Sequence, residues 1–176
     1  MRTERRFRPA SRYPEALMHV VRLTPDEGLR LRAIRLRALR DSPDAFGTVF
    51  ADEEAKSIAS WSQAIADLPT FVAVDEGCDV GMVRSGLDAR RADTAWLISM
   101  WVAPGARRRG IGEALIEVVV AWAEASGIHR LLLDVADDNA AAIALYAKTG
   151  FQPNGEAGSL PAPREHIREH RCELRI

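Results

Sequence analysis

The chain has 176 residues, of which 47% are hydrophobic and 28% are charged, and its formal net charge at pH 7 is −1. This composition is typical of one soluble globular domain, excludes an intrinsically disordered chain, and gives no general attraction to nucleic acid or anionic membranes. No apolar run approaches the roughly 20 residues that span a bilayer, and Cys78 and Cys172 lie in no zinc-binding pattern, so we expect no metal site and neither a membrane nor a nucleic-acid partner.

We expect residues 1–16 to form a flexible basic arm and residues 17–176 to form a single domain. The arm has five arginines but lacks the apolar stretch of a secretory signal, and its two glutamates argue against a transit peptide. These features predict a cytoplasmic protein. The charged residues in question are Arg2, Arg5, Arg6, Arg8, Arg12, Glu4 and Glu15.

The domain is expected to begin with a short strand at residues 19–23, followed by a helix that ends near residue 40. Thr24, Pro25 and Glu27 form a capping-box pattern at the start of this helix. Two apolar stripes on nearly opposite sides predict that the helix packs against a sheet and against a second helix. The stripes consist of Leu29, Ala33 and Leu36, and of Leu31, Ile34 and Ala38. Solvated edges are expected for Arg30, Arg32, Arg35, Arg37 and Arg40.

A second helix is predicted over about residues 52–68, where apolar residues recur at helical spacing. Three strands separated by a turn and a polar loop should follow. Trp61 and Trp96 are interpreted as core or interface residues rather than as groups that stack on a substrate. The three strands are expected at 71–74, 80–83 and 94–102.

The end of the third strand leads through an arginine- and glycine-rich turn into a helix over about residues 112–126. Pro104 and Gly105 end the strand, because proline lacks a donor and glycine loosens the backbone. Three arginines follow, and then Gly110 and Gly112. Free N–H groups at a helix start favour an anion, and glycines let it approach the backbone. This order predicts a site for a phosphorylated cofactor; an exposed arginine patch without function is the alternative.

Two other glycine-rich nucleotide motifs fit this turn poorly. A Rossmann fingerprint would need a glycine where Leu115 stands and an acidic residue at the end of a following strand. A Walker motif would need Gly-Lys-Ser or Gly-Lys-Thr, which the turn lacks. Neither motif therefore explains the turn.

The last third of the chain is expected to add two strands, one helix and a loop. Asn139 is placed to cap the helix, and the first strand is apolar enough to be buried on both faces. The loop is inferred from its proline, glycine and serine content. In chain order the strand, helix, loop and strand should occupy 128–135, 140–149, 152–163 and 168–176.

Two segments resemble the motifs of the GNAT acyltransferases. Arg107-x-x-Gly110-x-Gly112 is similar to that family's acetyl-CoA-binding motif, R/Q-x-x-G-x-G/A. Residues 139–151 are similar to its second motif, N-x-x-A-x-x-L-Y-x-x-x-G-F, and the order of elements is similar from about residue 18 onwards. The resemblance implies an α/β (α+β mixed) GNAT fold. Its central mixed, mostly antiparallel sheet would have six to seven strands, about four flanking helices and a splay at the cofactor site.

The resemblance also implies that coenzyme A lies between the strands at 96–102 and 128–135. Backbone groups of the first strand would bind the pantetheine arm, and amides of the arginine turn would bind the pyrophosphate. Tyr146 matches the family's general acid beside the thioester sulfur, although it could instead only fill the helix–sheet interface. Asn139 matches a cofactor-contacting asparagine, which is compatible with capping. The expected cofactor-binding residues are Met100, Trp101, Val102, Arg107, Arg108, Arg109, Gly110, Ile111, Gly112 and Asn139.

An amine with a pKa near 10 is almost fully protonated at pH 7, so the reaction needs a proton acceptor. Asp134 is one candidate, because some N-terminal acetyltransferases of the family carry an acidic residue at that offset. Its alternative role is to orient loops or to bind a helix end. Glu53 and Glu54 are weaker candidates that fit a solvated helix face better. His166 and His170 are further candidates, because histidine commonly serves as a base; one of them could line the acceptor pocket, but surface positions are expected for both.

These features together predict an enzyme, an acetyl-CoA-dependent N-acetyltransferase. The acetyl group would move directly to a primary amine in a ternary complex. The acceptor is expected to be a small-molecule or peptide amine, and the protein a monomer or homodimer. Two alternatives stay open: acetylation of protein N-termini, as by the ribosomal-protein acetyltransferases, and a non-catalytic acyl-CoA-binding module. Residues 37–46 resemble a segment of small-molecule or uncharacterised members of the family.

Overall fold

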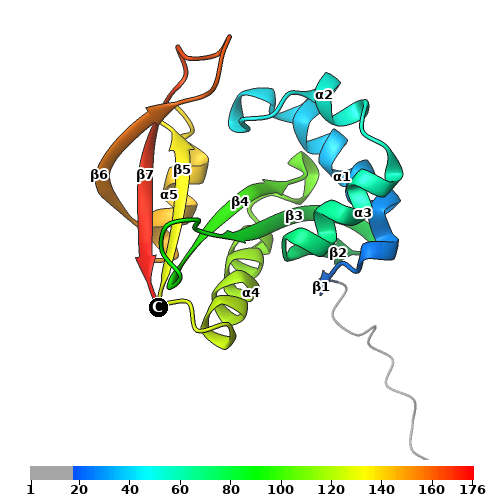
Figure 1. Ribbon diagram of the computed structural model, residues 1–176, viewed down its shortest axis with the longest axis horizontal. Helices are drawn as coiled ribbons and strands as arrows, with labels where there is room; N and C mark the ends of the chain where they lie inside the picture. Colours follow the sequence, from blue (N-terminus) through cyan, green and yellow to red (C-terminus); the bar gives the residue numbers. More distant parts are fainter. Residues whose placement is uncertain (1–17) are drawn as a thin grey trace, which may run out of the picture.

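The computed structural model describes residues 18–176, so the expected basic arm lies outside the described residues. Seven strands form one open sheet in the order β1-β2-β3-β4-β5-β7-β6 (Figure 1). Every neighbouring pair is antiparallel except β4 and β5. This arrangement confirms the predicted mixed, mostly antiparallel sheet. The strands are β1 (Met18–Arg22), β2 (Thr70–Asp75), β3 (Cys78–Leu87), β4 (Thr94–Val102), β5 (Arg130–Ala136), β6 (Gln152–Ser159) and β7 (Arg168–Arg175).

Five α-helices occur in residues 18–176, one more than expected, because the helix predicted over 52–68 is two helices. Ser57 starts the second of them: its Oγ accepts a hydrogen bond from the Ser60 N–H at 3.2 Å. No helix of the described chain is long and apolar enough to cross a membrane. The helices are α1 (Gly28–Asp41), α2 (Phe50–Glu54), α3 (Ile58–Asp67), α4 (Ile111–Ala125) and α5 (Ala140–Lys148), with 3-10 turns η1 (Pro25–Glu27), η2 (Pro43–Ala45) and η3 (Pro104–Ala106).

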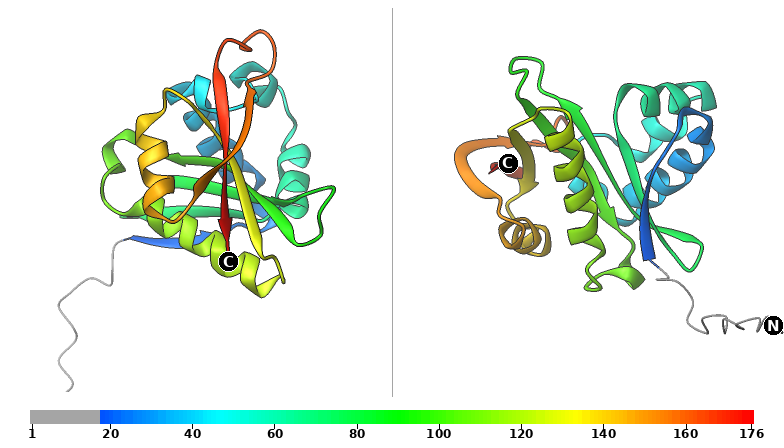
Figure 2. Two further views of the ribbon diagram at one scale, coloured as in Figure 1. Left: turned by 90° about the vertical axis from the view of Figure 1, so that its left-hand side faces the viewer. Right: turned by 90° about the horizontal axis from the view of Figure 1, so that it is seen from below.

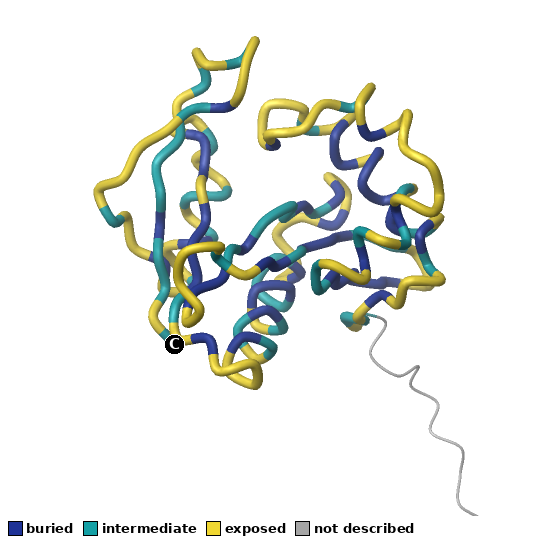
Figure 3. The backbone as a smooth tube through the Cα atoms, in the orientation of Figure 1, coloured by how far each residue is buried: buried dark blue, intermediate teal, exposed yellow. Residues whose placement is uncertain are grey.

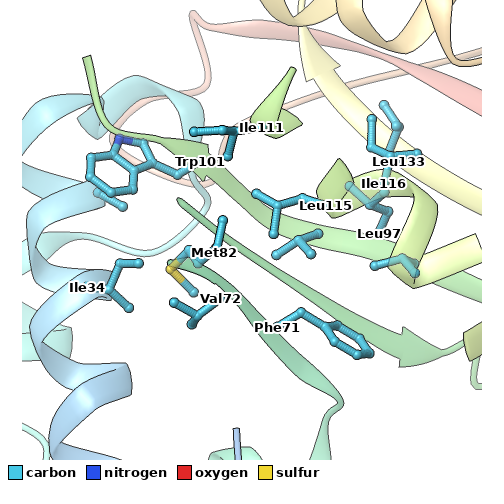
Figure 4. Close-up of a cluster of buried hydrophobic side chains, with 14 of the residues drawn as sticks. Ile34, Phe71, Val72, Met82, Leu97, Trp101, Ile111, Leu115, Ile116 and Leu133 are labelled. Atoms are coloured by element: carbon cyan, nitrogen blue, oxygen red, sulfur yellow. The ribbon is translucent and has the colours of Figure 1, made fainter. Parts of the chain in front are cut away.

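The helices lie on both faces of the sheet. Helices α1 and α3 cover one face of the β1–β4 half, and α4 covers the opposite face (Figure 2). Of the strands between these layers, β2 is buried along its whole length, and β3 and β4 consist of buried and half-buried residues except at the exposed ends of β3 (Figure 3). In the core, Ile34 of α1 lies beside Met82 of β3, and Leu115 and Ile116 of α4 lie near Leu97 of β4 (Figure 4). Burial of these apolar side chains is the main driving force for this packing.

Helix α1 has two apolar neighbours as predicted, but one predicted stripe was wrong at two of its three residues, whereas its third residue, Leu36, is buried. Leu29 is 66% exposed and Ala33 is also exposed. The reason is that the side of α1 that contacts α3 adjoins the side that contacts the sheet. The remaining side of the helix, which carries Leu29 and Ala33, is therefore exposed. Gly28 marks this contact, since a Cβ there would lie 2.9 Å from the Ser62 backbone nitrogen.

Arg35 was expected on a solvated edge of α1, and that expectation was also wrong. Only 6% of Arg35 is exposed. Its guanidinium carbon lies 4.4 Å from the centre of the Phe46 ring, and Nη2 donates to Thr48 Oγ1 at 2.9 Å. The planar guanidinium packs on the aromatic face, so this arginine holds the loop that follows α1.

The segment 152–163, expected to be a loop, contains strand β6 over its first eight residues, so that expectation was wrong. Strand β6 pairs antiparallel with β7, and the register shifts between Pro153 and Ala157. It lies at the edge of the sheet and is mostly exposed. Edge strands tolerate proline, glycine and polar residues, because one side needs no partner and little side-chain burial is required. The composition of this segment therefore gave no indication that it forms a strand.

Candidate functional site

The sheet opens between its two parallel strands. Strands β4 and β5 pair only at their first residues, and the last pair joins Trp96 to Leu132. Beyond this point β4 continues to Val102 and β5 to Ala136 without pairing to each other. The separated ends leave backbone groups free to bind a ligand, as expected for the splay.

A bulge in β4 redirects the strand at this opening. On β3, Met82 pairs with Trp101 and Arg84 with Ile98, so two residues of β4 face one residue of β3. One of the two, Ser99, has a φ of 56°, which is rare for a residue with a side chain. The sequence contained no glycine to signal the bulge, and it was not predicted. It re-aims Met100 toward the opening.

A cavity of about 590 Å³ lies at the opening. It is bounded by the end of β4, the turn before α4, the end of β5, helix α5 and the loop after α1. Residues 18–176 contain no group of three or more His, Cys, Asp or Glu side chains placed to hold a metal ion. Of the predicted site residues, the cavity brings together Met100, Trp101, Val102, Arg107, Arg108, Gly110, Gly112, Asp134, Asn139 and Tyr146.

The three arginines of the turn have different surroundings. Arg107 Nε donates to the Val102 carbonyl at 2.9 Å, and its Nη2 donates to Asp41. Arg109 forms an ion pair with Asp75 at 2.8 Å and does not line the cavity. Arg108 lines the cavity and has no ion pair or side-chain hydrogen bond within the described chain. Among the three side chains, Arg108 is therefore the one available to an anionic ligand.

The two predicted glycines have different physical roles. Gly110 is the N-cap of α4 with a φ of 81°, a left-handed conformation that strains other residues. Gly112 lies in the first turn of α4, where a Cβ would come 2.8 Å from Leu145 Cδ2 of α5. Gly110 shapes the start of α4, and Gly112 lets α4 and α5 approach closely. Ile111, predicted with them, has a side chain buried in the core.

One carboxylate that sequence reasoning missed joins several parts of the site. Asp41 Oδ2 accepts hydrogen bonds from Trp101 Nε1 at 2.9 Å, from Ser42 Oγ at 2.7 Å and from Arg107. Burial alone would raise the pKa of Asp41, but these hydrogen bonds outweigh it and hold the pKa below its usual value. Asp41 thus links the end of α1 to β4 and to the arginine turn.

Tyr146 lies at the inner wall of the cavity and is 7% exposed. Its ring meets Phe151 edge-on, with 5.8 Å between ring centres. No hydrogen bond from its hydroxyl to another described residue is present, so the hydroxyl is free to meet a ligand. Burial, and to a smaller extent Cys172, raises the pKa of Tyr146 well above its usual value. The phenol therefore keeps its proton across the physiological pH range.

Asn139 both caps α5 and lines the cavity. Its Oδ1 accepts a hydrogen bond from the Ala142 N–H at 3.2 Å, as the capping prediction requires. Its position in the cavity wall agrees with the second predicted role as well. The two roles remain compatible, because the side-chain amide nitrogen is not used in capping.

Asp134 lines the cavity, with both carboxylate oxygens bound by Arg171 at 2.8 and 3.2 Å. Arg171 also binds Glu156 and stacks 4.5 Å from the ring centre of Trp96. The hydrogen bonds to Asp134 raise the pKa of Arg171, which stays charged. The predicted base is thus held in place by a permanent cation.

The weaker base candidates lie elsewhere. The interpretation of Glu53 as part of a solvated face was wrong: Glu53 is 6% exposed and binds Lys56 at 2.9 Å. Glu54 is exposed, and neither glutamate lines the cavity. His166 is exposed, and His170 Nδ1 lies 2.7 Å from Asp137 Oδ1. None of these four side chains is placed to reach a ligand in the cavity.

Comparison with known proteins points to one family. The model of the acetyltransferase (GNAT) family matches residues 34–151. The chain is 44% identical over 59 residues to the [ribosomal protein bS18]-alanine N-acetyltransferase of Escherichia coli K12, covering 34% of this chain and 40% of that protein. It is 28% identical over 121 residues to the mycothiol acetyltransferase of Beutenbergia cavernae, covering 69% and 40%. The chain thus spans less than half the length of these curated relatives.

Solved structures share the fold over nearly the whole described chain. A GNAT-family acetyltransferase of Streptococcus pneumoniae superposes with a TM-score of 0.75 at 22% identity, covering 90% of this chain and 99% of that one. The protein yncA of Salmonella typhimurium, solved with acetyl-CoA, gives 0.71 at 18% identity, with 90% and 94% coverage.

Proposed function

The chain belongs to the GNAT acetyltransferase family, and from that premise we propose that it transfers an acetyl group from acetyl-CoA to a primary amine. One observation carries the proposal. A single cavity contains the helix start with Gly110 and Arg108, the bulged end of β4, and the free hydroxyl of Tyr146. These groups are the ones needed to bind a phosphorylated thioester and to protonate a departing sulfur.

The proposed cofactor contacts follow from the surroundings of each residue. The amides at the start of α4 and the side chain of Arg108 would hold the pyrophosphate. Backbone groups from Met100 to Val102, which no longer pair with β5, would hold the pantetheine arm. Asn139 would contact the cofactor with the part of its side chain that the helix cap leaves unused. The buried Ile111 and the paired Arg109 would contribute at most their backbone amides.

The proposed reaction is a direct transfer. The nitrogen of a neutral amine attacks the thioester carbonyl, a C–N bond forms and the C–S bond breaks. A backbone N–H near the β4 bulge would polarise the carbonyl oxygen. The nitrogen loses one proton, and Tyr146 gives its proton to the sulfur, so acetylated amine and free coenzyme A result. Because burial raises the pKa of Tyr146, the phenol is protonated before the transfer and has a proton to give.

We propose that Asp134 accepts the proton from the amine, directly or through water. Asp134 lines the cavity from strand β5. Its pairing with Arg171 supports the alternative role equally, since such a pair also fixes the position of neighbouring strands. Rates of the Asp134→Asn variant, measured at several pH values, would distinguish the base role from the positioning role. Loss of a base should lower the rate most at low pH, where free amine is scarce.

Acetylation of a protein N-terminus is the second candidate function. Its specific support is the 44% identity over 59 residues to the acetyltransferase that acts on ribosomal protein bS18. A binding module without catalysis is disfavoured by the intact Tyr146 in the cavity wall.

A screen of acceptors tests the proposal. Purified protein is mixed with acetyl-CoA and amino acids, diamines, polyamines, aminoglycosides or peptides, and the released thiol is measured. We expect amine-dependent thiol release, with an acetylated amine detected by mass spectrometry. Binding of acetyl-CoA without release in the presence of any amine would instead favour the binding module.

A further inference from the structure

The loop between α1 and α2 (residues 42–49) forms one wall of the cavity. Ser42, Ala45 and Phe46 of this α1–α2 loop line the space that Asp134 faces from β5. If acetyl-CoA lies along the arginine turn, as proposed above, this is the part of the cavity left for the acceptor. The chemistry of the wall therefore bears on which amines can enter.

The inner side of the α1–α2 loop is held firmly. At its start, Asp41 binds Trp101 and Arg107, which belong to the cofactor side of the cavity. Further along, the buried Arg35 packs on Phe46 and donates to Thr48. These contacts leave the loop little freedom to swing away from the cavity.

The outer side of the same loop is bound by a second loop. The β6–β7 loop (residues 160–167) lies at the same end of the sheet (Figure 1). Arg164 in this loop donates from Nη1 to the Pro43 carbonyl at 2.6 Å and from Nη2 to the Gly47 carbonyl at 3.2 Å. Pro161 lies beside Gly47, since its Cδ would be 3.9 Å from a Cβ at that position. One guanidinium thus binds two carbonyls of the α1–α2 loop, one at the start of η2 and one two residues after its end. We call this pair of hydrogen bonds the Arg164 clasp.

The β6–β7 loop has its own internal support. Leu160 is 2% exposed, and its N–H donates to the Ile167 carbonyl at 3.0 Å. Arg164 N–H donates to the Pro161 carbonyl at 2.9 Å. The clasp therefore joins two ordered loops, and charge-assisted hydrogen bonds of this kind are stronger than neutral ones.

The clasp limits what can be attached to the acceptor amine. An extended hexapeptide is roughly 20 Å long, so most of it would have to leave the cavity, whose volume is about 590 Å³. Where η2 lies near β5, Arg164 joins the α1–α2 loop to the loop that leads into β7. A peptide that left the cavity between these two loops would have to break both hydrogen bonds of Arg164, whereas an amine contained in the cavity would break none.

We propose that the acceptor is a compact amine contained within the cavity and that Arg164, by closing the exit between the two loops, determines this specificity. The inference rests on the proposed acetyl transfer and names the substrate class for it. The amine nitrogen of the compact acceptor gains the acetyl carbon and loses a proton, and coenzyme A leaves as the thiol.

The test compares kcat/KM for two acceptor sets, amino acids with diamines and polyamines, and hexapeptides with free N-termini. It uses the wild-type protein, Arg164→Ala, Arg164→Lys and the control Arg90→Ala. Arg90 is likewise an arginine in a loop; it is exposed, and its side chain makes no hydrogen bond or ion pair with the described residues. Lysine keeps the charge but cannot bind two carbonyls in the same fork. Thermal melts and the KM for acetyl-CoA report whether each variant is folded.

For the wild type we expect kcat/KM for the best compact amine to exceed that for the best peptide by about 100-fold. Arg164→Ala should reduce this ratio about 10-fold, Arg164→Lys should reduce it less, and Arg90→Ala should leave it unchanged. The KM for acetyl-CoA should stay within about 2-fold of wild type in all variants. A wild-type preference for peptides, or an unchanged ratio in a folded Arg164→Ala, would overturn this inference alone. Absence of acetylation with both sets would overturn the proposed function itself.

Discussion

The proposed cofactor side of the cavity, at the starts of α4 and α5, and the proposed acceptor side, at the α1–α2 loop, are held together in different ways. On the cofactor side the decisive interactions are local: Asn139 caps a nitrogen three residues away, and Arg107 binds a carbonyl five residues away. On the acceptor side, and where the two sides meet, the interactions join distant parts of the chain. Asp41 binds Trp101 across 60 residues, and Arg164 binds the Pro43 carbonyl across 121 residues. The first side can be recognised from a short motif, and the second cannot.

This difference has a functional consequence. Local interactions at a helix start build a binding site for a constant ligand, whose phosphates need only amides and a cation. Long-range clasps between loops build a wall that can change shape with few substitutions, as expected where specificity varies. Variants on the two sides should therefore change different kinetic constants.

The largest effect is expected where the two sides meet, at Tyr146. Tyr146→Phe keeps the ring but removes the acid, so kcat should fall about 100-fold while the Kd for acetyl-CoA stays unchanged. Since burial raises the pKa of Tyr146, its proton is retained as pH increases, and wild-type kcat should show no decline from this group up to about pH 10. Steady-state rates over pH and calorimetric titration with acetyl-CoA provide the measurements. Full turnover by the variant at every pH would refute the acid role.

Substitutions of the arginines in the turn should have a smaller effect, and they should change the affinity for acetyl-CoA by different amounts. Arg108→Ala is expected to raise the Kd for acetyl-CoA about 10-fold, as the loss of one charge-assisted hydrogen bond would. Arg109→Ala serves as the control, because Arg109 is paired with Asp75 outside the cavity, and should change the Kd by less than about 2-fold. Calorimetry at two salt concentrations should show the difference shrinking as salt increases. Equal effects of the two substitutions would contradict the assignment.

The smallest change in kinetic constants is expected when Asp41, which connects the two sides, is substituted. Asp41→Asn should raise the KM values for acetyl-CoA and for the amine together, each about 3-fold, because Arg107 and the α1–α2 loop lose a shared anchor. Asp44→Asn, an exposed carboxylate of η2 without a hydrogen-bond partner in the described chain, is the matched control. If only one of the two KM values moved, the linking role would be wrong.

Asp41 also predicts a pH dependence of stability. Its folded-state pKa lies below the unfolded value of about 3.9, so its contribution is present above that pH and is lost as the pH falls toward the folded-state pKa. The difference in unfolding free energy between the wild type and Asp41→Asn should thus be constant from about pH 5 to 8 and shrink below about pH 4. Urea unfolding across this range measures it.

Much of the fold and the cofactor side could be predicted because local rules sufficed. Glycine marked the left-handed position of Gly110, an asparagine marked the α5 cap, and apolar runs marked the buried strands. Placement of Tyr146 beside the opening followed from its spacing after Asn139 in the motif. In each case the physical requirement falls within a few residues of the signal.

The parts that could not be predicted depend on partners distant in sequence. Ser99 adopts a strained backbone conformation at the bulge, where the pairing of β4 with β3 changes register. No glycine at this position indicated such a conformation. Arg35 and Glu53 looked like surface charges, since nothing in their immediate sequence reveals that Arg35 packs on Phe46 and binds Thr48 or that Glu53 is buried. Strand β6 can form from proline- and glycine-rich residues because it lies at the edge of the sheet. The composition of the segment does not reveal that position.

The central claim is direct transfer from acetyl-CoA to an amine within this one cavity. A single-turnover experiment with the best acceptor from the screen, quenched in acid and read by mass spectrometry of both the small molecules and the intact protein, tests it most directly. The account predicts that acetylated amine and free coenzyme A appear together in equal amounts, with no acetyl group on the protein. Release of coenzyme A with a protein-bound acetyl group, for example on Cys172, or without an acetylated amine would contradict it.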